Sequence, residues 1–451
     1  MNTDTIFAPA SGAGRAAIAV IRVSGPGAGA AVREMTGGAA PPRAARLTEI
    51  RDPASGETLD KGLVLWFPGP ASFTGEDMAE FHLHGGRAVV AGVTDALAAR
   101  PGLRPAEPGE FTRRAFMNGK LDLTEAEGLA DLVDAETDAQ RRQALRQMDG
   151  VLGRLYEGWR GTLVRALAHL EADIDFPDES LPEGVREAVR PNILRVIDDI
   201  TQHLDDNRRG ERLRDGLYIA IVGPPNVGKS SLLNALARRD AAIVAETVGT
   251  TRDVIEVHLD VGGYPVIVAD TAGLRATADE VEDEGVRRAR ARAADADLRI
   301  AMVEASEWPA IDPEVRPVID ADALLVVNKI DLRRPRPDVD VARLAPKPAA
   351  AVAVSVRTGE GMADFLAALE GQVAARIGSL AAGAAPALTR ARHRAALEDC
   401  RAALARFEAA QGPELAAEDV RMAARALGRI TGRVDVEDIL DVIFRDFCIG
   451  K

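Results

Sequence analysis

The octapeptide Gly223-Pro-Pro-Asn-Val-Gly-Lys-Ser230 decides the fold of the central part of this 451-residue chain. The apolar run Leu217–Val222 precedes it, and a segment beginning Ser231-Leu-Leu-Asn follows it. This order predicts a buried strand, a glycine-rich loop and a helix, which together present backbone N–H groups and a helix N-terminus to phosphates. In this pattern Lys229 reaches the outer phosphates and Ser230 binds Mg²⁺. We therefore expect a nucleotide-binding α/β domain.

Two further motifs are predicted to sense the state of the bound nucleotide. Gly249-Thr-Thr-Arg-Asp253 supplies Thr251, a threonine that completes the magnesium shell and contacts the γ-phosphate. The apolar run Val266–Ala269 leads into Asp270-Thr-Ala-Gly273, which places a carboxylate near the magnesium ion and a glycine N–H near the γ-phosphate. Both motifs follow the phosphate loop in the order typical of GTP-binding domains.

Another motif indicates the base. The apolar run Leu324–Val327 ends in Asn328-Lys-Ile-Asp331, where the aspartate accepts hydrogen bonds from N1 and the exocyclic amine of guanine. Adenine does not offer this pair of donors. The stretch Ser355-Val-Arg-Thr-Gly-Glu-Gly361 is similar to the last guanine-contacting loop of such domains, with Val356 in place of the usual alanine. We therefore predict GTP rather than ATP, bound by Asn226, Val227, Gly228, Lys229, Ser230, Ser231, Gly249, Thr250, Thr251, Asp270, Thr271, Ala272, Gly273, Asn328, Lys329, Asp331, Ser355, Val356 and Arg357.

The residue that activates the attacking water is not evident from these motifs. In Ras-like enzymes a glutamine follows the Asp-x-x-Gly motif, whereas this chain has Leu274 there. Candidate replacements lie in the acidic stretch 279–284, a pattern that is also typical of a solvated helix start. A second unusual residue is Asn226, because one potassium-dependent group of GTPases uses an asparagine at this position to hold K⁺ where other enzymes insert an arginine finger.

The composition excludes several classes of protein. Hydrophobic residues make up 47% of the chain and aromatic residues 4%, which is typical of an aliphatic, helix-rich globular protein. No stretch approaches the roughly 18 uninterrupted apolar residues of a membrane span, and the first residues do not resemble a signal peptide, so we expect a cytoplasmic protein. The two cysteines, Cys400 and Cys448, exclude a disulfide framework and a four-cysteine zinc site.

The charge bears on possible partners. A net charge of -14 argues against a protein that wraps nucleic acid by bulk electrostatics, so any RNA contact must be local or shared with a partner. Only six of the 56 basic residues are lysines, and a lysine in so biased a chain is a candidate for a role that needs a compact ammonium group. Two of the six, Lys229 and Lys329, fall within the nucleotide motifs described above.

The pattern of residues predicts several domains. Residues 1 to about 118 favour mixed α/β structure, with strands at Ala17–Val23, Gly62–Phe67 and Ala79–Leu83 and a helix over Ala88–Arg100. Helical periodicity dominates from Asp122 to about Arg214, with an interruption near Asp175. Strands and helices alternate from 217 to about 370, and a helical pattern returns over 388–447 after the alanine- and glycine-rich stretch 379–386. We infer an N-terminal domain (1–120) and a helical domain in two segments (121–214 and 379–451), with the nucleotide-binding domain (215–378) inserted between them.

Strings outside the nucleotide motifs extend a family resemblance over essentially the whole chain. They are Ile21-Arg-Val-Ser-Gly, Trp66-Phe-Pro-Gly-Pro, Phe73-Thr-Gly-Glu-Asp, His84-Gly-Gly, Pro108-Gly-Glu-Phe-Thr, Asn118-Gly-Lys-Leu-Asp, Ile174-Asp-Phe-Pro-Asp-Glu and the final Phe447-Cys-Ile-Gly-Lys451. With them, the chain resembles the MnmE (TrmE) family of tRNA-modification GTPases. The resemblance implies an α/β folate-binding domain, a discontinuous helical domain and an inserted Ras-like P-loop GTPase domain.

The resemblance also implies chemistry and partners. Members of the family form homodimers through their N-terminal domains and a heterotetramer with the flavoprotein MnmG. The complex uses FAD, a reduced nicotinamide nucleotide, glycine or ammonium, and a tetrahydrofolate one-carbon derivative (the 5,10-methylene or 5-formyl form). With GTP hydrolysis, Mg²⁺ and K⁺, it adds an aminomethyl-type group to carbon 5 of the wobble uridine of tRNA.

The resemblance assigns further residues by position. The folate-binding positions correspond to Arg22, Glu80, Lys120 and Lys451, and the catalytic acid of GTP hydrolysis corresponds to Glu282. The implied magnesium ligands are Ser230 and Thr251, and the implied potassium ligands are Asn226, Ala245, Thr247 and Thr250. The resemblance also adds Ala245, Glu246, Thr247 and Val248 to the predicted GTP-binding residues. Ala245 and Thr247 differ in type from the residues expected there, but a ligand that is a backbone carbonyl survives such a change. Cys448 is implied to lie near the tRNA chemistry; a small buried hydrophobe is the alternative.

Two other functions remain open from the residues alone. A ribosome-assembly GTPase of the Era or Der kind shares the asparagine of the phosphate loop. Such a protein should carry a basic RNA-binding appendage, whereas this chain is acidic. A GTP-gated scaffold without chemistry of its own is the other alternative, because no residue by itself names the modified base. Folate binding discriminates between these functions and the tRNA-modifying one.

Overall fold

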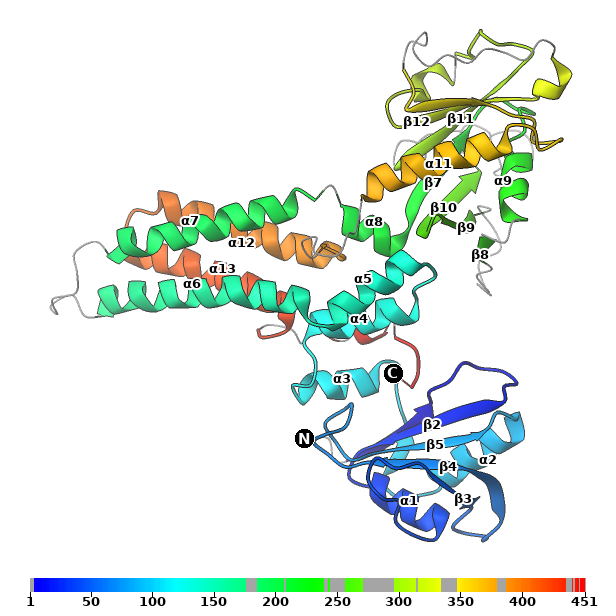
Figure 1. Ribbon diagram of the computed structural model, residues 1–451. Coiled ribbons are helices and arrows are strands. Elements are labelled where there is room, and N and C mark those ends of the chain that lie inside the picture. The colour runs from blue at the N-terminus through cyan, green and yellow to red at the C-terminus, as the bar shows by residue number, and fades with distance from the viewer. Residues whose placement is uncertain are drawn as a thin grey trace, which may run out of the picture. The chain divides into compact units, whose positions relative to one another are not determined.

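The computed structural model describes residues 4–175, 185–206, 208–238, 242–243, 256–270, 296–313, 315–333, 347–378, 387–434, 440, 443–445 and 447–450. They form two compact units (Figure 1). The first unit comprises Met1–Ala130, Gln147–Val189 and Ala403–Lys451, and the second comprises Asp131–Arg146 and Arg190–Ala402. Each unit consists of separate stretches of the chain. The boundaries between those stretches fall within four helices: α4 (Leu123–Val133), α5 (Asp138–Met148), α7 (Val185–Leu204) and α12 (Ala391–Ala409).

The N-terminal part of the first unit is a six-stranded sheet. Its order is β3 (Arg46–Arg51), β4 (Thr58–Phe67), β5 (Met78–His84), β2 (Ile18–Ser24), β1 (Thr5–Pro9) and β6 (Leu103–Pro105). The pairs are antiparallel except for β1 with β6. Side chains alternate between the two faces, so Ile21 and Phe81 enter a core with helices α1 (Ala28–Thr36) and α2 (Arg87–Ala98), while Arg22 and Glu80 lie on the opposite face.

The rest of the first unit is helical. It contains α3 (Glu110–Met117), most of α4 (Leu123–Val133), α6 (Val151–Asp175) and α13 (Pro413–Thr431). Helices α6 and α13 run antiparallel, because Thr431 donates to Glu157 at 2.7 Å while Arg421 pairs with Glu171 at 2.6 Å. The buried face of α13 is rich in alanine, which lets the two helices approach closely. These two helices flank the second unit's sheet in sequence, so the helical domain is discontinuous.

The second unit is built on a mainly parallel seven-stranded sheet. Its order is β13 (Ala350–Ala353), β12 (Ala323–Asn328), β11 (Leu298–Glu304), β7 (Leu217–Val222), β10 (Tyr264–Asp270), β9 (Glu256–Val261) and β8 (Ala242–Ile243). Only the pairs β9–β10 and β8–β9 among these described strands are antiparallel. Every residue of β12 is buried, which explains its unbroken apolar sequence.

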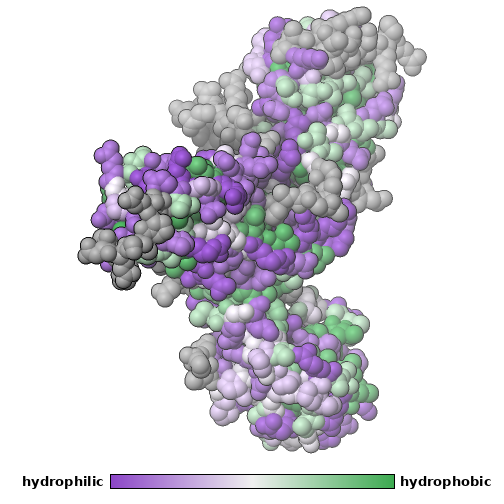
Figure 2. Space-filling view, turned by 60° about the vertical axis from the view of Figure 1, so that its left-hand side comes forward, coloured by the Kyte–Doolittle hydropathy of each residue, from purple (hydrophilic) through white to green (hydrophobic). Residues whose placement is uncertain are grey.

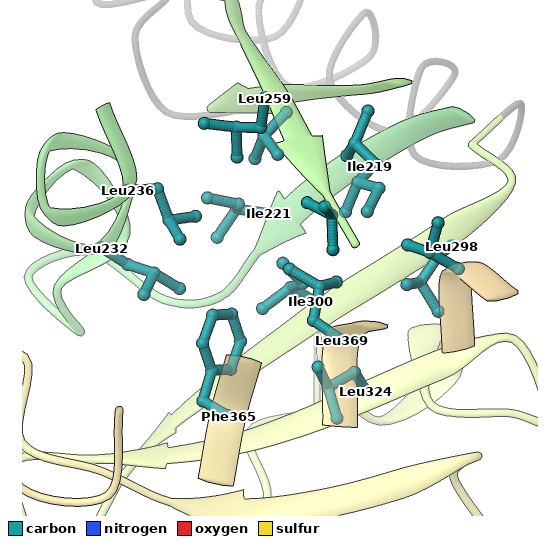
Figure 3. Close-up of a cluster of buried hydrophobic side chains, with 14 of the residues drawn as sticks. Ile219, Ile221, Leu232, Leu236, Leu259, Leu298, Ile300, Leu324, Phe365 and Leu369 are labelled. Atoms are coloured by element: carbon teal, nitrogen blue, oxygen red, sulfur yellow. The ribbon is translucent and has the colours of Figure 1, made fainter. Parts of the chain in front are cut away.

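Helices complete the second unit. They are α5 (Asp138–Met148), α7 (Val185–Leu204), α8 (Arg209–Asp215), α9 (Lys229–Ala237), α11 (Met362–Ile377) and α12 (Ala391–Ala409), with short 3-10 segments η1 (Arg316–Val318) and η2 (Ile330–Leu332). Side chains of α9 and α11 meet the sheet in the core that Figure 3 shows, where Leu232, Ile300 and Phe365 are each fully buried. This core fixes the strands whose ends carry the nucleotide motifs.

The predicted fold class, α/β domains plus a discontinuous helical domain, is confirmed. The predicted strand Leu217–Val222 has the bounds observed for β7, and the predicted helix over Ala88–Arg100 corresponds to α2. Strands β1 and β3 and helix α1 were not predicted from the sequence. The linker expected at 379–386 lies outside the described residues.

No helix in the described part of the chain combines the length and the apolar character that crossing a membrane requires. In the space-filling view, hydrophilic residues cover much of the face shown and hydrophobic residues form smaller patches between them (Figure 2).

Candidate functional site

The phosphate loop joins β7 to α9 and depends on its glycines. Gly228 has a φ of 109°, and a Cβ atom there would lie 2.4 Å from Nδ2 of Asn328. At Gly223 a Cβ atom would lie 2.7 Å from the carbonyl oxygen of Met302. Asn226 also has a positive φ, 62°, a conformation that asparagine tolerates better than most residues. The loop can therefore follow this path only with these residue types or close substitutes.

The side chain of Lys229 reaches back from the start of α9 to the beginning of this loop. The residue is only 7% exposed, and its Nζ donates to the carbonyl oxygens of Gly223 at 2.7 Å and Pro224 at 2.9 Å. The lysine is also the first residue of α9, so its charge adds to the partial positive charge of the helix N-terminus. Together these features make the loop an anion site.

The side chain of Asn328 connects the phosphate loop to the predicted guanine loop. It is 3% exposed, its Nδ2 donates to the carbonyl oxygen of Val227 at 2.8 Å, and its Oδ1 accepts from the N–H of Val356 at 3.2 Å. Both ends of the amide are therefore satisfied inside the protein. The first residue of the Asn-Lys-x-Asp motif thus sets the spacing between the two loops.

Asp331 accepts hydrogen bonds from two residues of the predicted guanine loop (355–361). Its Oδ1 accepts from the hydroxyl of Ser355 at 2.6 Å, and its Oδ2 accepts from Arg357 at 2.5 Å. The Ser355 hydroxyl chiefly, with the Arg357 guanidinium, holds the pKa of Asp331 below its usual value. Asp331 is therefore ionised at neutral pH and can act only as an acceptor, which is what two guanine donors require.

Lys329 lies between these two polar residues and faces a different partner. It has a φ of 65°, and its Nζ donates to Oε2 of Glu304 at 2.6 Å. This hydrogen bond, with one from Ser306, lowers the pKa of Glu304. Glu304 was not among the site residues predicted from the sequence, although it pairs with Asn328 across β11 and β12 and so lies at the same edge of the sheet.

The predicted magnesium and switch residues are only partly described. Ser230 is the second residue of α9, and the backbone of Asp270 ends β10 with its Cα paired to Ile221, so both positions lie at the edge that carries the phosphate loop. The remaining predicted positions lie outside the described residues: Ala245, Glu246, Thr247, Val248, Gly249, Thr250, Thr251, Thr271, Ala272, Gly273 and Glu282. Lys451 lies outside them as well.

A second polar cluster lies on the outer face of the first unit's sheet. Arg22 and Glu80 are 58 residues apart in sequence but are cross-strand partners, and two N–H groups of Arg22 donate to Oε1 of Glu80 at 3.1 and 3.2 Å. The guanidinium of Arg22 lies over the rings of Phe73 and Phe111, at 5.5 and 5.8 Å from their centroids. The two phenylalanines were not predicted as site residues, because they lie in the quoted strings but carry no polar group.

The C-terminal residues meet this cluster. Arg22 also donates to the carbonyl oxygen of Gly450 at 3.4 Å, and a Cβ atom at Gly450 would lie 2.1 Å from the carbonyl oxygen of Pro9. Cys448 is exposed, and its carbonyl oxygen accepts from Gly109 at 3.4 Å. Its exposure argues against the alternative of a buried hydrophobe.

Lys120 lies beside the loop that carries Phe73. Its Nζ donates to the carbonyl oxygen of Pro70 at 3.1 Å, and its side chain packs next to Gly75. The loop over residues 68–77 therefore contacts Lys120 and also supplies the ring beneath Arg22. Three of the four predicted folate positions are thus linked through this loop and the β2–β5 pair.

Comparisons with known proteins cover the whole chain. Residues 5–120 match the family model described as the GTP-binding protein TrmE N-terminus, and residues 123–448 match the model described as the MnmE helical domain. A protein named tRNA modification GTPase MnmE from Parvibaculum lavamentivorans is 58% identical over 99% of this chain and 100% of its own length. A protein of the same name from Paramagnetospirillum magneticum is 58% identical over the full length of both chains. The mitochondrial 5-taurinomethyluridine-[tRNA] synthase subunit GTPB3 of Danio rerio is 50% identical over 99% of this chain and 93% of its own length.

The arrangement around Asp331 generates a prediction about base recognition. In Asp331→Asn an amide NH₂ would face the two donors of guanine, so GDP affinity should fall by about 10²–10⁴-fold. Xanthine carries an oxygen in place of the exocyclic amine, so affinity for its diphosphate should rise in the variant. Calorimetric titration of both nucleotides measures these changes.

The matched control is Asp320→Asn. Asp320 pairs with Arg299 and precedes β12, so it lies at the opposite edge of the sheet and its substitution should leave GDP affinity unchanged. Equal GDP affinity in Asp331→Asn and the wild type would mean that this aspartate does not read the base.

Proposed function

This chain belongs to the MnmE family of tRNA modification GTPases, and from that premise we propose that it couples GTP hydrolysis to modification of carbon 5 of the wobble uridine in certain tRNAs. The observation that carries the GTP half of this proposal is the convergence of Lys229, Asn328 and Asp331 at one edge of the parallel sheet. The tRNA half is supported by full-length similarity to proteins named for tRNA modification. The similarity favours this function over the ribosome-assembly and scaffold alternatives.

The residues of the phosphate loop suit two cations. Ser230 at the start of α9 would hold Mg²⁺ together with Thr251, and Mg²⁺ neutralises charge on the phosphates. Asn226 is exposed on the loop, and its amide oxygen would act as a ligand of K⁺ together with Ala245, Thr247 and Thr250. Potassium at this place would supply the positive charge that an arginine finger supplies in other GTPases.

The protein's own groups then perform the remaining steps of hydrolysis. Lys229 and the N–H groups of the loop bind the phosphates, and Asp331 with Ser355 holds the base. Leu274 has no group that accepts a hydrogen bond, so another residue must orient the attacking water. We assign this task to Glu282, which the family resemblance alone distinguishes from its acidic neighbours.

We further propose that the first unit binds a tetrahydrofolate one-carbon derivative at Arg22, Glu80, Lys120 and Lys451. The charged groups of these residues suit the functional groups of such a ligand. A pterin ring carries a pair of donors that suits a carboxylate, and the glutamate tail of folate carries carboxylates that suit lysine and arginine. Phe73 and Phe111 add an aromatic surface next to Arg22. When bound, the folate would supply the one-carbon unit for the uridine.

We also propose that the protein acts together with a second copy of itself and with a flavoprotein. A homodimer through the N-terminal domains and a heterotetramer with the flavoprotein MnmG would bring FAD and a reduced nicotinamide nucleotide to the tRNA. A partner's surface would also compensate for the net charge of -14, which is unfavourable for binding RNA. We propose that the domain division is the one given above, with boundaries near residues 120, 214 and 378.

Analysis of tRNA nucleosides tests this function directly. A strain that lacks the protein should lose the modified wobble uridine, and a plasmid carrying the chain should restore it. An unchanged nucleoside profile in the deletion strain would exclude the tRNA function.

Complementation with Cys448→Ser tests the role of the exposed thiol. We expect intact GTP hydrolysis with impaired modification. Full modification with Cys448→Ser would exclude a role for the thiol.

The exposed position of Asn226 leads to a prediction about salt. GTP turnover at matched ionic strength should be far faster in KCl than in NaCl, because K⁺ beside Asn226 would supply the charge of an arginine finger, which is worth about 10³-fold or more. Asn226→Gly should abolish the difference while tolerating the φ of 62°. Asn234→Ala, which alters an exposed asparagine on α9, should keep it. Equal wild-type rates in the two salts would contradict the assignment.

The role assigned to Glu282 is tested by single-turnover hydrolysis in KCl. Glu282→Ala should lower the rate by about 10²–10⁴-fold, the usual contribution of general acid–base assistance, with little change in GTP affinity. Binding survives because the phosphate contacts come from Lys229 and the loop backbone. Glu280→Ala and Glu284→Ala serve as matched controls and should hydrolyse GTP at the normal rate. A wild-type rate in Glu282→Ala would show that another group orients the water.

A further inference from the structure

Both carboxylate oxygens of Glu80 are engaged, and by different residues. Arg22 contacts Oε1, as described above, whereas Nε2 of His82 lies 3.2 Å from Oε2. Glu80 and His82 are two residues apart on β5, so their side chains share the outer face of the sheet, opposite the core residue Phe81. The side chains of Arg22, Glu80 and His82 are 20%, 18% and 30% exposed, which makes this a partly buried chain of three polar groups.

The chemistry of the contact fixes the role of His82. An ionised carboxylate can only accept hydrogen bonds, so the ring must donate from Nε2. Arg22 is held independently, by the rings of Phe73 and Phe111 and by the carbonyl oxygen of Gly450. The guanidinium therefore fixes one oxygen of Glu80, and the imidazole fixes the other. With both oxygens held, the plane of the carboxylate is set before any ligand arrives.

We infer that His82 is a positioning residue for the folate site, orienting the Glu80 carboxylate toward the pair of donors on a pterin ring. This inference rests on the proposed folate site at Arg22 and Glu80 and adds a residue that the family resemblance did not assign. A preset carboxylate binds a planar pair of donors more tightly than a rotating one, because less side-chain entropy is lost on binding. The alternative is a surface ion pair without function, which contributes little in most proteins.

Binding of 5-formyltetrahydrofolate to the full chain, measured by calorimetry, distinguishes these possibilities. His82→Phe keeps the size and plane of the ring but removes the donor, and it should weaken binding about tenfold, the value of one charge-assisted hydrogen bond. His82→Gln restores an N–H donor and should return most of the affinity. His84→Phe is the matched control: His84 lies on the same face of β5 but pairs with Asp60, so its variant should bind like the wild type.

The possible results distinguish a failure of the positioning role of His82 from a failure of the proposed folate site. Wild-type affinity in His82→Phe, with weak binding in Glu80→Gln, would overturn the positioning role and leave the folate site standing. Wild-type affinity in Glu80→Gln as well, or no folate binding by the unaltered chain, would overturn both. Weak binding in His82→Phe that His82→Gln does not rescue would indicate a structural role and would also overturn the inference.

A spectroscopic measurement on the unaltered protein tests the hydrogen bond between His82 and Glu80 itself. The chain has six histidines, so ¹⁵N labelling of histidine alone gives few signals, and His82→Gln identifies the one that belongs to His82. The inference requires a proton on Nε2 of His82. A ring that carries its proton on Nδ1 and leaves Nε2 bare could not donate to Glu80 and would contradict it.

Discussion

The hydrogen bonds of one buried amide, that of Asn328, hold the nucleotide edge of the second unit together. Parallel strands bring several loops to one edge of the sheet, but they do not fix the distances between those loops. Asn328 does so by donating to the phosphate loop and accepting from the guanine loop. Because its side chain is almost fully buried, leaving either neighbour unpaired would cost about 1–3 kcal/mol. Gly228 is constrained in turn, since any side chain there would collide with this amide.

In the first unit, Arg22 connects separate parts of the proposed folate site in a comparable way. Arg22 connects two strands of the sheet, two aromatic rings and the carbonyl oxygen of Gly450, so the end of the chain becomes part of a site that begins at residue 22. Position 450 is constrained as well, because a side chain there would collide with the carbonyl oxygen of Pro9. The two halves of the proposed activity thus have separate polar clusters, GTP hydrolysis in one unit and folate binding in the other.

Much of this could be predicted from the sequence, and what could not has physical causes. The central strands were predictable because burial on both faces leaves a continuous apolar run, as in β12. Strand β3 was missed because it lies at the sheet edge and buries only Ile50. The nucleotide residues stand in short motifs, whereas the roles of Phe73, Phe111 and His82 depend on the register between β2 and β5, which no local pattern encodes.

The claim that Asn328 sets the geometry of the nucleotide edge is tested most directly by the GDP affinity of Asn328→Ala, with the fold checked by circular dichroism. The variant removes both hydrogen bonds but leaves Lys229, Asp331 and Ser355 in place. If the amide fixes the spacing of the two loops, GDP should bind at least about tenfold more weakly in a folded protein. A folded variant that binds GDP as tightly as the wild type would contradict the account.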